Sequence, residues 1–247
     1  MGRAAVDRPE THVNGGQGPT GLPRRLVVCG TDTDVGKTLV SAWLVQGLGA
    51  RYWKPVQSGL EDGGDSATVQ RLLGLPAERL MPEAYRLQTP VSPHWAAEID
   101  GVTIEAQRLA PPAGDGPLVV ETAGGLLVPL SRQWLQIEQL QRWGLPVVLV
   151  ARSGLGTLNH TLLSLEALRV RAITVLGLVL NGPSHPDNPR TLEQLGRVPV
   201  LAQFPPLAAP SAALLAEQWR RLGMARHWPA AAPPASVEPQ ATPELTP

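Results

Sequence analysis

The chain of 247 residues is long enough for one α/β domain or two small ones, and its 43% hydrophobic residues supply a substantial core. Lys and Arg number 21, as do Asp and Glu, so a formal net charge of zero offers no basic footprint for nucleic acid. The single cysteine, Cys29, excludes an intrachain disulfide and a multi-cysteine metal site. No stretch reaches the roughly 18 apolar residues of a membrane-spanning helix, and the N-terminus lacks the apolar centre of a secretory signal. We therefore expect no nucleic-acid partner, no membrane partner and a cytoplasmic location.

The two ends of the chain differ in composition from the middle. Residues 1–24 are polar and rich in Gly and Pro, and residues 228–247 are rich in Pro and Ala. Neither segment can bury enough apolar surface to offset the entropy of ordering it, so we expect both to be disordered. The remaining residues, 25–227, are expected to form a single domain.

Within that domain, short apolar runs alternate with segments of helical periodicity. In chain order the pattern predicts a strand at 26–29, a helix at 39–48, a short strand at 54–56, and helices at 65–73 and 103–110. Pro55 must end the short strand or place it at an edge. The pattern then predicts a strand at 117–120, a helix at 134–143, a strand at 146–150, a helix at 158–170, a strand at 173–180, a helix at 188–195, a strand at 198–202 and a helix at 211–222.

This alternation predicts a doubly wound α/β fold, with a mostly parallel sheet and helices on both faces, as in P-loop NTPases. Ligands of such sheets bind beyond the carboxyl ends of the strands. Functional residues are therefore expected directly after Cys29, Val56, Val120, Val150 and Leu180.

The first predicted strand leads into a loop, GTDTDVGKT at 30–38, that opens a helix and resembles a phosphate-binding loop with one extra residue. Backbone N–H groups and the helix N-terminus attract phosphate, Lys37 can reach the β and γ phosphates, and the Thr38 hydroxyl can ligate Mg²⁺. The alternative is a glycine turn capped by threonine beside an exposed lysine, and the strand–loop–helix context favours phosphate binding. Asp32 and Asp34 are expected to point away from the nucleotide or toward a cation. The residues expected to contact ATP here are Asp34, Val35, Gly36, Lys37, Thr38 and Leu39.

This loop and the string KPVQSG at 54–59 together resemble the dethiobiotin synthetase family, whose hallmark is GTDT[DE]VGKT followed by KP[VI]xSG. Weaker matches follow in order: SPH at 92–94, ETAGG at 121–125, GTLNH at 156–160, Asn181 at a strand end and PPL at 205–207. The resemblance covers about residues 26–207. One departure is Thr122, where the family usually has glycine. A β-branched residue restricts the backbone of a loop that would lie beside the triphosphate.

The resemblance implies roles for several polar residues. Lys54, together with Lys37, would be catalytic by electrostatic stabilisation of the γ-phosphate and the carbamate, although a lysine at a strand end can also be a surface lysine. Ser58 would bind the substrate carbamate, or else cap a turn. Thr38, Asp65 and Glu121 would hold Mg²⁺, although Asp65 could also be a helix N-cap. The remaining ATP contacts implied by the family are Asp65, Glu121, Thr122, Ala123, Gly124, Asn181, Gly182, Pro205, Pro206 and Leu207.

The reaction that the resemblance implies is an ATP- and Mg²⁺-dependent cyclo-ligation in biotin biosynthesis. An amine of 7,8-diaminononanoate takes up CO2 as a carbamate, which attacks the γ-phosphate of ATP. The second amine then closes the ring of dethiobiotin on a carbamic–phosphoric anhydride. The resemblance further implies a homodimer with the diamine at the subunit interface.

Two other classes share this type of ATP site. A partitioning-ATPase switch carries a signature lysine in its loop, and Asp32 occupies the corresponding position here. A ligase of the cobyrinic acid amidation type needs a glutaminase domain with a catalytic cysteine, and Cys29 lies in the wrong place for that role. The partitioning-ATPase class also leaves the KPVQSG string without a function.

Overall fold

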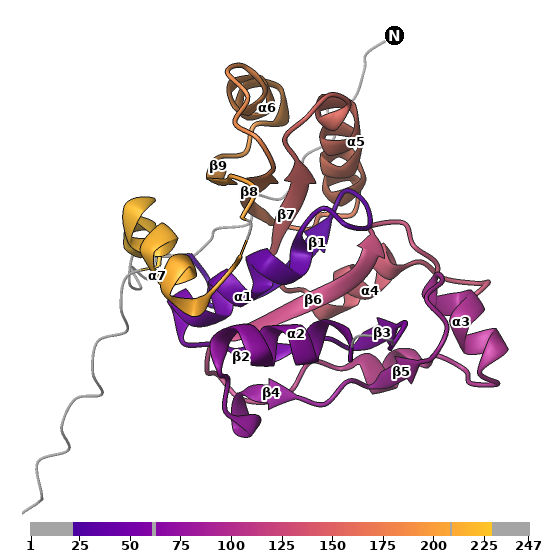
Figure 1. Ribbon diagram of the computed structural model, residues 1–247. Coiled ribbons are helices and arrows are strands. Elements are labelled where there is room, and N and C mark those ends of the chain that lie inside the picture. The colour runs from indigo at the N-terminus through magenta and orange to yellow at the C-terminus, as the bar shows by residue number, and fades with distance from the viewer. Residues whose placement is uncertain (1–21, 61–62, 208, 229–247) are drawn as a thin grey trace, which may run out of the picture.

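The computed structural model describes residues 22–60, 63–207 and 209–228 of the chain. Its main sheet has seven strands in the order β4-β2-β6-β1-β7-β8-β9, and every neighbouring pair is parallel. This arrangement confirms the predicted doubly wound, mostly parallel fold (Figure 1). The strands are β1 (Arg25–Gly30), β2 (Arg51–Trp53), β4 (Leu80–Met81), β6 (Leu118–Gly125), β7 (Val147–Arg152), β8 (Val175–Asn181) and β9 (Val200–Phe204).

Six helices cover the two faces of this sheet. The face of α1 also carries α2 and α7, and the opposite face carries α4, α5 and α6. Within the described residues no helix combines the length and apolarity needed to cross a bilayer. The helices are α1 (Lys37–Leu48), α2 (Gly64–Leu73), α4 (Gln136–Trp143), α5 (Thr157–Val170), α6 (Asn188–Gly196) and α7 (Ala212–Arg221).

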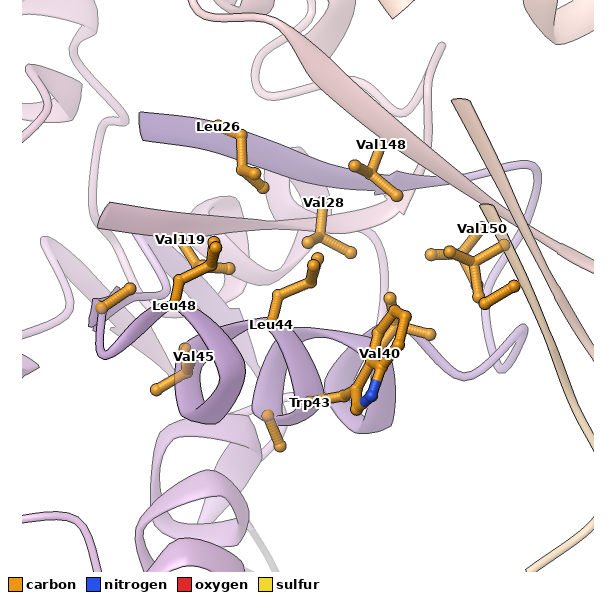
Figure 2. Packing of buried hydrophobic residues seen from close by; sticks show 14 of the residues in the cluster. Leu26, Val28, Val40, Trp43, Leu44, Val45, Leu48, Val119, Val148 and Val150 are labelled. Carbon is orange, nitrogen blue, oxygen red and sulfur yellow. The ribbon is translucent and has the colours of Figure 1, made fainter. Parts of the chain in front are cut away.

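The central strand β1 shows why the sheet is buried on both sides. Leu26 and Val28 project toward α1, whereas Val27 and Cys29 project toward the opposite helices, because successive side chains of a strand point to opposite faces. Figure 2 shows Val40, Leu44 and Leu48 at helical spacing, with Trp43 and Val45 beside them, packed against Val28, Val119, Val148 and Val150 of three strands. Each fully buried aliphatic side chain contributes roughly 1.5–3 kcal/mol. This packing fixes the position of α1 against the sheet, and therefore also the position of the phosphate loop that connects β1 to α1.

A small second sheet departs from the sequence prediction. Lys54 and Pro55 lie between two strands rather than inside one, because β2 ends at Trp53 and β3 (Val56–Ser58) pairs with β5 (Tyr85–Leu87) in a separate sheet. Pro55 lacks the N–H that a continuous ladder would need. The predicted pattern of strands and helices did not include β4, β5 or α3 (Pro93–Ile99). β4 is the edge strand of the main sheet, whereas β5 and α3 contribute buried residues to the core around the small sheet.

The predicted helix at 103–110 is wrong. Its residues form a short 3-10 helix, η2 (Ala106–Leu109), and two prolines follow directly. Leu109 and Ile104 instead bury their side chains in the core of the small sheet. Two further 3-10 helices, η1 (Ala77–Arg79) and η3 (Met224–Arg226), connect or end other elements.

The predicted tails fall mostly outside the described residues, which exclude 1–21 and 229–247. The described part nevertheless extends past the expected domain limits of 25 and 227. Leu22 N donates to His227 O at 2.7 Å, and Trp228 Nε1 donates to Pro23 O at 2.9 Å. Trp228 is buried in the core on the α1 face, so the folded unit includes at least residues 22–24 and 228.

Candidate active site

The phosphate loop connects β1 to α1, and its backbone requires glycine at Gly36. This residue has φ 94°, and a Cβ placed on it would lie 2.0 Å from Asn181 Nδ2. Asn181, at the end of β8, donates from the same amide to Val35 O at 3.1 Å. Asn181 therefore braces the loop, and α1 begins immediately afterwards at Lys37.

Two charged residues of the loop, Asp32 and Lys37, have polar partners in the structure. Asp32 Oδ2 lies 3.5 Å from Arg152 Nη1, so this acid has a cationic partner at the end of β7. Lys37 Nζ donates to Asp32 O at 2.9 Å, which folds its chain back over the loop. Burial lowers the pKa of the Lys37 ammonium below its ordinary value, and the nearby charge of Lys54 lowers it further. Lys37 is thus a cation held at the helix N-terminus, where an anion would also be stabilised.

Three segments far apart in the sequence meet at the start of α1. Thr38 Oγ1 donates to Glu121 Oε1 at 2.9 Å and lies 3.0 Å from Asp65 Oδ1. Lys54 Nζ lies 2.7 Å from Asp65 Oδ2 and 3.2 Å from Glu121 Oε1, and it donates to Thr122 O at 2.9 Å. The four side chains that the sequence singled out as catalytic or metal-binding at this point therefore form one cluster.

The electrostatics of the cluster keep its charges in place. Burial alone would lower the pKa of Lys54, but the carboxylates of Glu121 and Asp65 outweigh burial and raise it above its ordinary value. Burial alone would raise the pKa of Asp65, but the Lys54 ammonium outweighs it and holds this pKa below its usual range. Lys54 is 3% exposed, so it is not the surface lysine of the alternative reading.

A cavity of about 740 Å³ opens beside this cluster. The residues predicted for catalysis, ATP or substrate that line it are Asp34, Gly36, Lys37, Thr38, Lys54, Ser58, Asp65, Glu121, Ala123 and Gly124. Ser58 lines the cavity, and its Oγ is buried without a hydrogen-bond partner among the described residues, so it caps no turn. The lining residues to which the sequence assigned no role are Thr33, Val56, Gln57, Pro90, Val91, Ser92, Pro93 and Val128, of which Thr33, Val56, Gln57, Ser92 and Pro93 stand in the quoted motifs.

The other predicted ATP contacts lie away from this lining. Val35 and Leu39 pack into or against the core on the α1 face, and Leu207 does the same after β9. Asn181 and Gly182 end β8 beside the phosphate loop. Pro205 and Pro206 follow β9 and are exposed.

Thr122 does not belong to a loop. It lies inside β6, is 1% exposed and donates from Oγ1 to Val28 O at 3.3 Å. Extended backbone suits a β-branched residue. The expected restriction of a loop conformation therefore does not arise, because β6 continues five residues past the predicted end of its strand at Val120.

Several positioning contacts had no signal in the sequence. Gln57 Oε1 accepts from Asp65 N at 3.0 Å, while its Nε2 donates to Ser58 O and Gly59 O, so it ties the second motif to α2. Asp65 is not the N-cap of α2, because that position belongs to Gly63. Gln136 Oε1 accepts from Ala123 N at 3.0 Å and thereby holds the end of β6.

The oxygen donors at this point suit magnesium. The described residues contain no group of three or more His, Cys, Asp and Glu side chains that could hold a metal on its own. Magnesium bound with a nucleotide keeps waters and phosphate oxygens and needs only one or two carboxylates from the protein. Next to the phosphate loop, Thr38 supplies a hydroxyl within hydrogen-bonding distance of two carboxylates, those of Asp65 and Glu121.

Fold and site together define a P-loop nucleotide-binding α/β protein. A family model described as an AAA domain matches residues 24–213. The cell-division ATPase MinD of Pyrococcus furiosus is similar in structure, with a TM-score of 0.51 and 16% identity over 80% of this chain and 99% of that chain, a likeness of fold alone.

The sequence relatives are much closer. An ATP-dependent dethiobiotin synthetase BioD of Rhodopseudomonas palustris (strain HaA2) is 58% identical over 186 residues, which are 75% of this chain and 87% of the relative. An ATP-dependent dethiobiotin synthetase BioD of Nitrobacter hamburgensis is 54% identical over 187 residues, which are 76% of this chain and 88% of the relative. The chain belongs to the ATP-dependent dethiobiotin synthetase family.

Proposed function

We propose that this chain is an ATP-dependent cyclo-ligase that forms dethiobiotin from 7,8-diaminononanoate and CO2. The observation that carries the proposal is the buried Lys54 ammonium, held between Asp65 and Glu121 at the mouth of the phosphate loop. A carbamate and ATP are both anionic, so bringing them together requires fixed positive charge at this place. The partitioning-ATPase class assigns no role to this second lysine.

Each residue of the cluster has a part in the proposed reaction. Lys37 binds the phosphates from the loop, and Lys54 stabilises charge where the carbamate oxygen approaches the γ-phosphate. Neither lysine needs to transfer a proton for this role. Ser58, which lines the cavity and has a hydroxyl without a partner among the described residues, orients the carbamate. Holding the second amine near the activated carbon then favours ring closure through proximity.

Thr38, Asp65 and Glu121 are proposed to hold Mg²⁺, whose charge would offset that of the phosphates when it is bound. Asn181 is proposed to contact the nucleotide base, and Gly182 and the 205–207 segment are proposed to contact ATP, as the family resemblance implies. The homodimer with the diamine at its interface also stays part of the proposal. The cytoplasmic location stays a prediction.

The test is release of ADP from ATP and bicarbonate in the presence and absence of 7,8-diaminononanoate. We expect ADP release to require the diamine, with dethiobiotin formed in equal amount. Lys54→Met, which keeps the length of the side chain and removes its charge, should abolish most of the diamine-dependent release. Release that ignores the diamine would favour a nucleotide switch of the partitioning-ATPase type over a ligase.

A further inference from the structure

The hydroxyl of Tyr52 meets the carboxylate of Glu121 on the side away from Thr38. We propose that Tyr52 is a positioning residue that limits Glu121 to one metal-facing oxygen and so favours Mg²⁺ over Ca²⁺. The inference rests on the proposed role of this cluster in holding a metal with ATP. It goes further by assigning metal discrimination to a residue that does not line the cavity.

Strand register brings the two residues together. β2 and β6 are parallel neighbours, and Tyr52 stands opposite Val119. Glu121 lies two residues beyond Val119, so it projects from the same face of the sheet, toward α1. Tyr52 is fully buried, and its side chain reaches along this face until its hydroxyl lies 2.9 Å from Glu121 Oε2.

The two oxygens of Glu121 have separate partners. Oε1 accepts from Thr38 and lies near Lys54, whereas Oε2 accepts from Tyr52. An ionised carboxylate accepts hydrogen bonds and donates none, so the phenol must be the donor of this pair. Its hydrogen bond therefore holds the plane of the carboxylate and occupies the second oxygen.

Asp65 shows the same division. Its Oδ1 lies 3.0 Å from Thr38 Oγ1, while its Oδ2 lies 2.7 Å from Lys54 Nζ. Both carboxylates thus turn one oxygen toward Thr38 and have the other oxygen held by a buried donor. Two acids fixed in this way offer a metal one oxygen each.

The two ions differ in how they use a carboxylate. Ca²⁺ takes six to eight oxygen ligands at about 2.3–2.6 Å and often binds both oxygens of one carboxylate, whereas Mg²⁺ requires near-octahedral geometry at about 2.0–2.1 Å. One-oxygen ligands suit the octahedral ion and deny the larger ion part of its coordination. Residues that orient a metal ligand in this way typically change metal affinity by about 10–100-fold when they are replaced.

The test compares Tyr52→Phe with the wild type and with Tyr85→Phe. Phenylalanine keeps the buried ring and removes only the hydroxyl. Tyr85 is the matched control, because it is also buried but its hydroxyl accepts from Glu105 N at 2.9 Å instead of donating to a carboxylate of the cluster. Calorimetric titration would give the affinity for a non-hydrolysable ATP analogue as a function of Mg²⁺ and of Ca²⁺, without any turnover.

We expect the wild type and Tyr85→Phe to share one preference for Mg²⁺, and Tyr52→Phe to lose about 10-fold of it, chiefly by gaining affinity with Ca²⁺. An unchanged preference in Tyr52→Phe, or equal losses with both ions, would overturn the inference. A wild type whose nucleotide affinity ignores both ions would instead overturn the proposed metal site.

A measurement on the wild type alone covers the case in which Tyr52→Phe does not fold. The separation of the two carboxylate stretching bands in the infrared differs between one-oxygen and two-oxygen coordination. With ¹³C-labelled glutamate, the difference spectrum on adding Mg²⁺ and nucleotide should show the one-oxygen pattern. A two-oxygen pattern would contradict the assignment of Tyr52.

Discussion

Lys54 is the residue on which both the stability and the chemistry of the site depend. Its ammonium serves two carboxylates, one of which, Glu121, is almost completely buried. Lys54→Met leaves these two acids without their cation, and removing one partner of a buried ion pair costs about 3–5 kcal/mol. We expect a loss of this size in the free energy of unfolding at pH 7, measured by urea denaturation.

The pH dependence of this loss follows from Asp65. Because Lys54 holds the pKa of Asp65 below its usual range, the folded chain binds fewer protons than the unfolded chain at acidic pH. The stabilisation is complete above the unfolded pKa of about 3.9 and is lost as pH falls through the lower folded pKa. The difference between wild type and Lys54→Met should therefore shrink below about pH 4. Arg132→Met, which breaks an exposed pair with Glu98, should change nothing measurable, and a constant Lys54 effect down to pH 3 would contradict the pairing.

At the scale of single residues, the sequence could predict those whose function needs a fixed chemical type at a fixed spacing. Lys37, Thr38 and Lys54 stand in two motifs. Asp65 and Glu121 were identified from weaker matches further along the chain. Tyr52 and Gln57 could not be predicted, because their importance depends on which strand lies next to which. Gln57 also occupies a position that the family motif leaves open.

At the scale of elements, the contact between α1 and α7 carries a prediction. Gly47 lies in α1, and a Cβ there would come within 2.2 Å of the Trp219 ring in α7. Alanine normally stabilises a helix by up to about 1 kcal/mol relative to glycine. Here the overpacking, which costs about 1–3 kcal/mol, should outweigh that gain. We expect Gly47→Ala to lower the free energy of unfolding while KM for ATP stays unchanged.

The control for this substitution is Gly116→Ala, in a loop where a Cβ would have no neighbour within 4 Å. Tryptophan fluorescence during urea unfolding reports both variants. A Gly47→Ala protein as stable as the wild type would mean that α7 moves aside at no cost.

The elements also show where periodicity fails as a predictor. The long helices and the buried strands β1, β7, β8 and β9 were predicted to within a few residues, since their apolar runs are bounded by glycine, proline or polar loops. By contrast, β6 runs five residues past its predicted end, and β2 lies at 51–53 rather than at 54–56. The small sheet was missed because β3 and β5 have three residues each, and the edge strand β4 of the main sheet was missed because it has two; these strands are too short for a recognisable pattern. The 103–110 segment has helical composition, but its Ile104 and Leu109 are needed by the core of that small sheet.

For the molecule as a whole, the doubly wound class followed from alternating elements, but the strand order did not. The order places β6 between β1 and β2. Glu121 of β6 therefore contacts Thr38, which follows β1, on one side, and Tyr52 and Lys54, which lie in and after β2, on the other side. No local pattern encodes this insertion. The order β2-β6-β1 is set by tertiary packing, and this order brings the residues of the site together.

The last prediction concerns how the chain ends are held. An aromatic series runs from Phe204 in β9 through Trp43 in α1 and Trp219 in α7 to Trp228, with ring centroids 4.8, 5.2 and 5.9 Å apart in that order. Trp228 also donates to Pro23 O and thereby joins the two ends of the described fold. Replacing a buried tryptophan by alanine costs about 3–5 kcal/mol.

For a domain of this size each kcal/mol corresponds to about 2–4 °C, so Trp228→Ala should lower the thermal midpoint by about 6–20 °C. None of the four aromatic residues lines the cavity, so KM for ATP below the transition should not change. Trp95→Ala, at a tryptophan that is 51% exposed on α3, should leave the midpoint close to the wild type. If both variants melt together near the wild-type midpoint, Trp228 does not fasten the chain ends, and the folded domain would stop at residue 227 as its composition suggested.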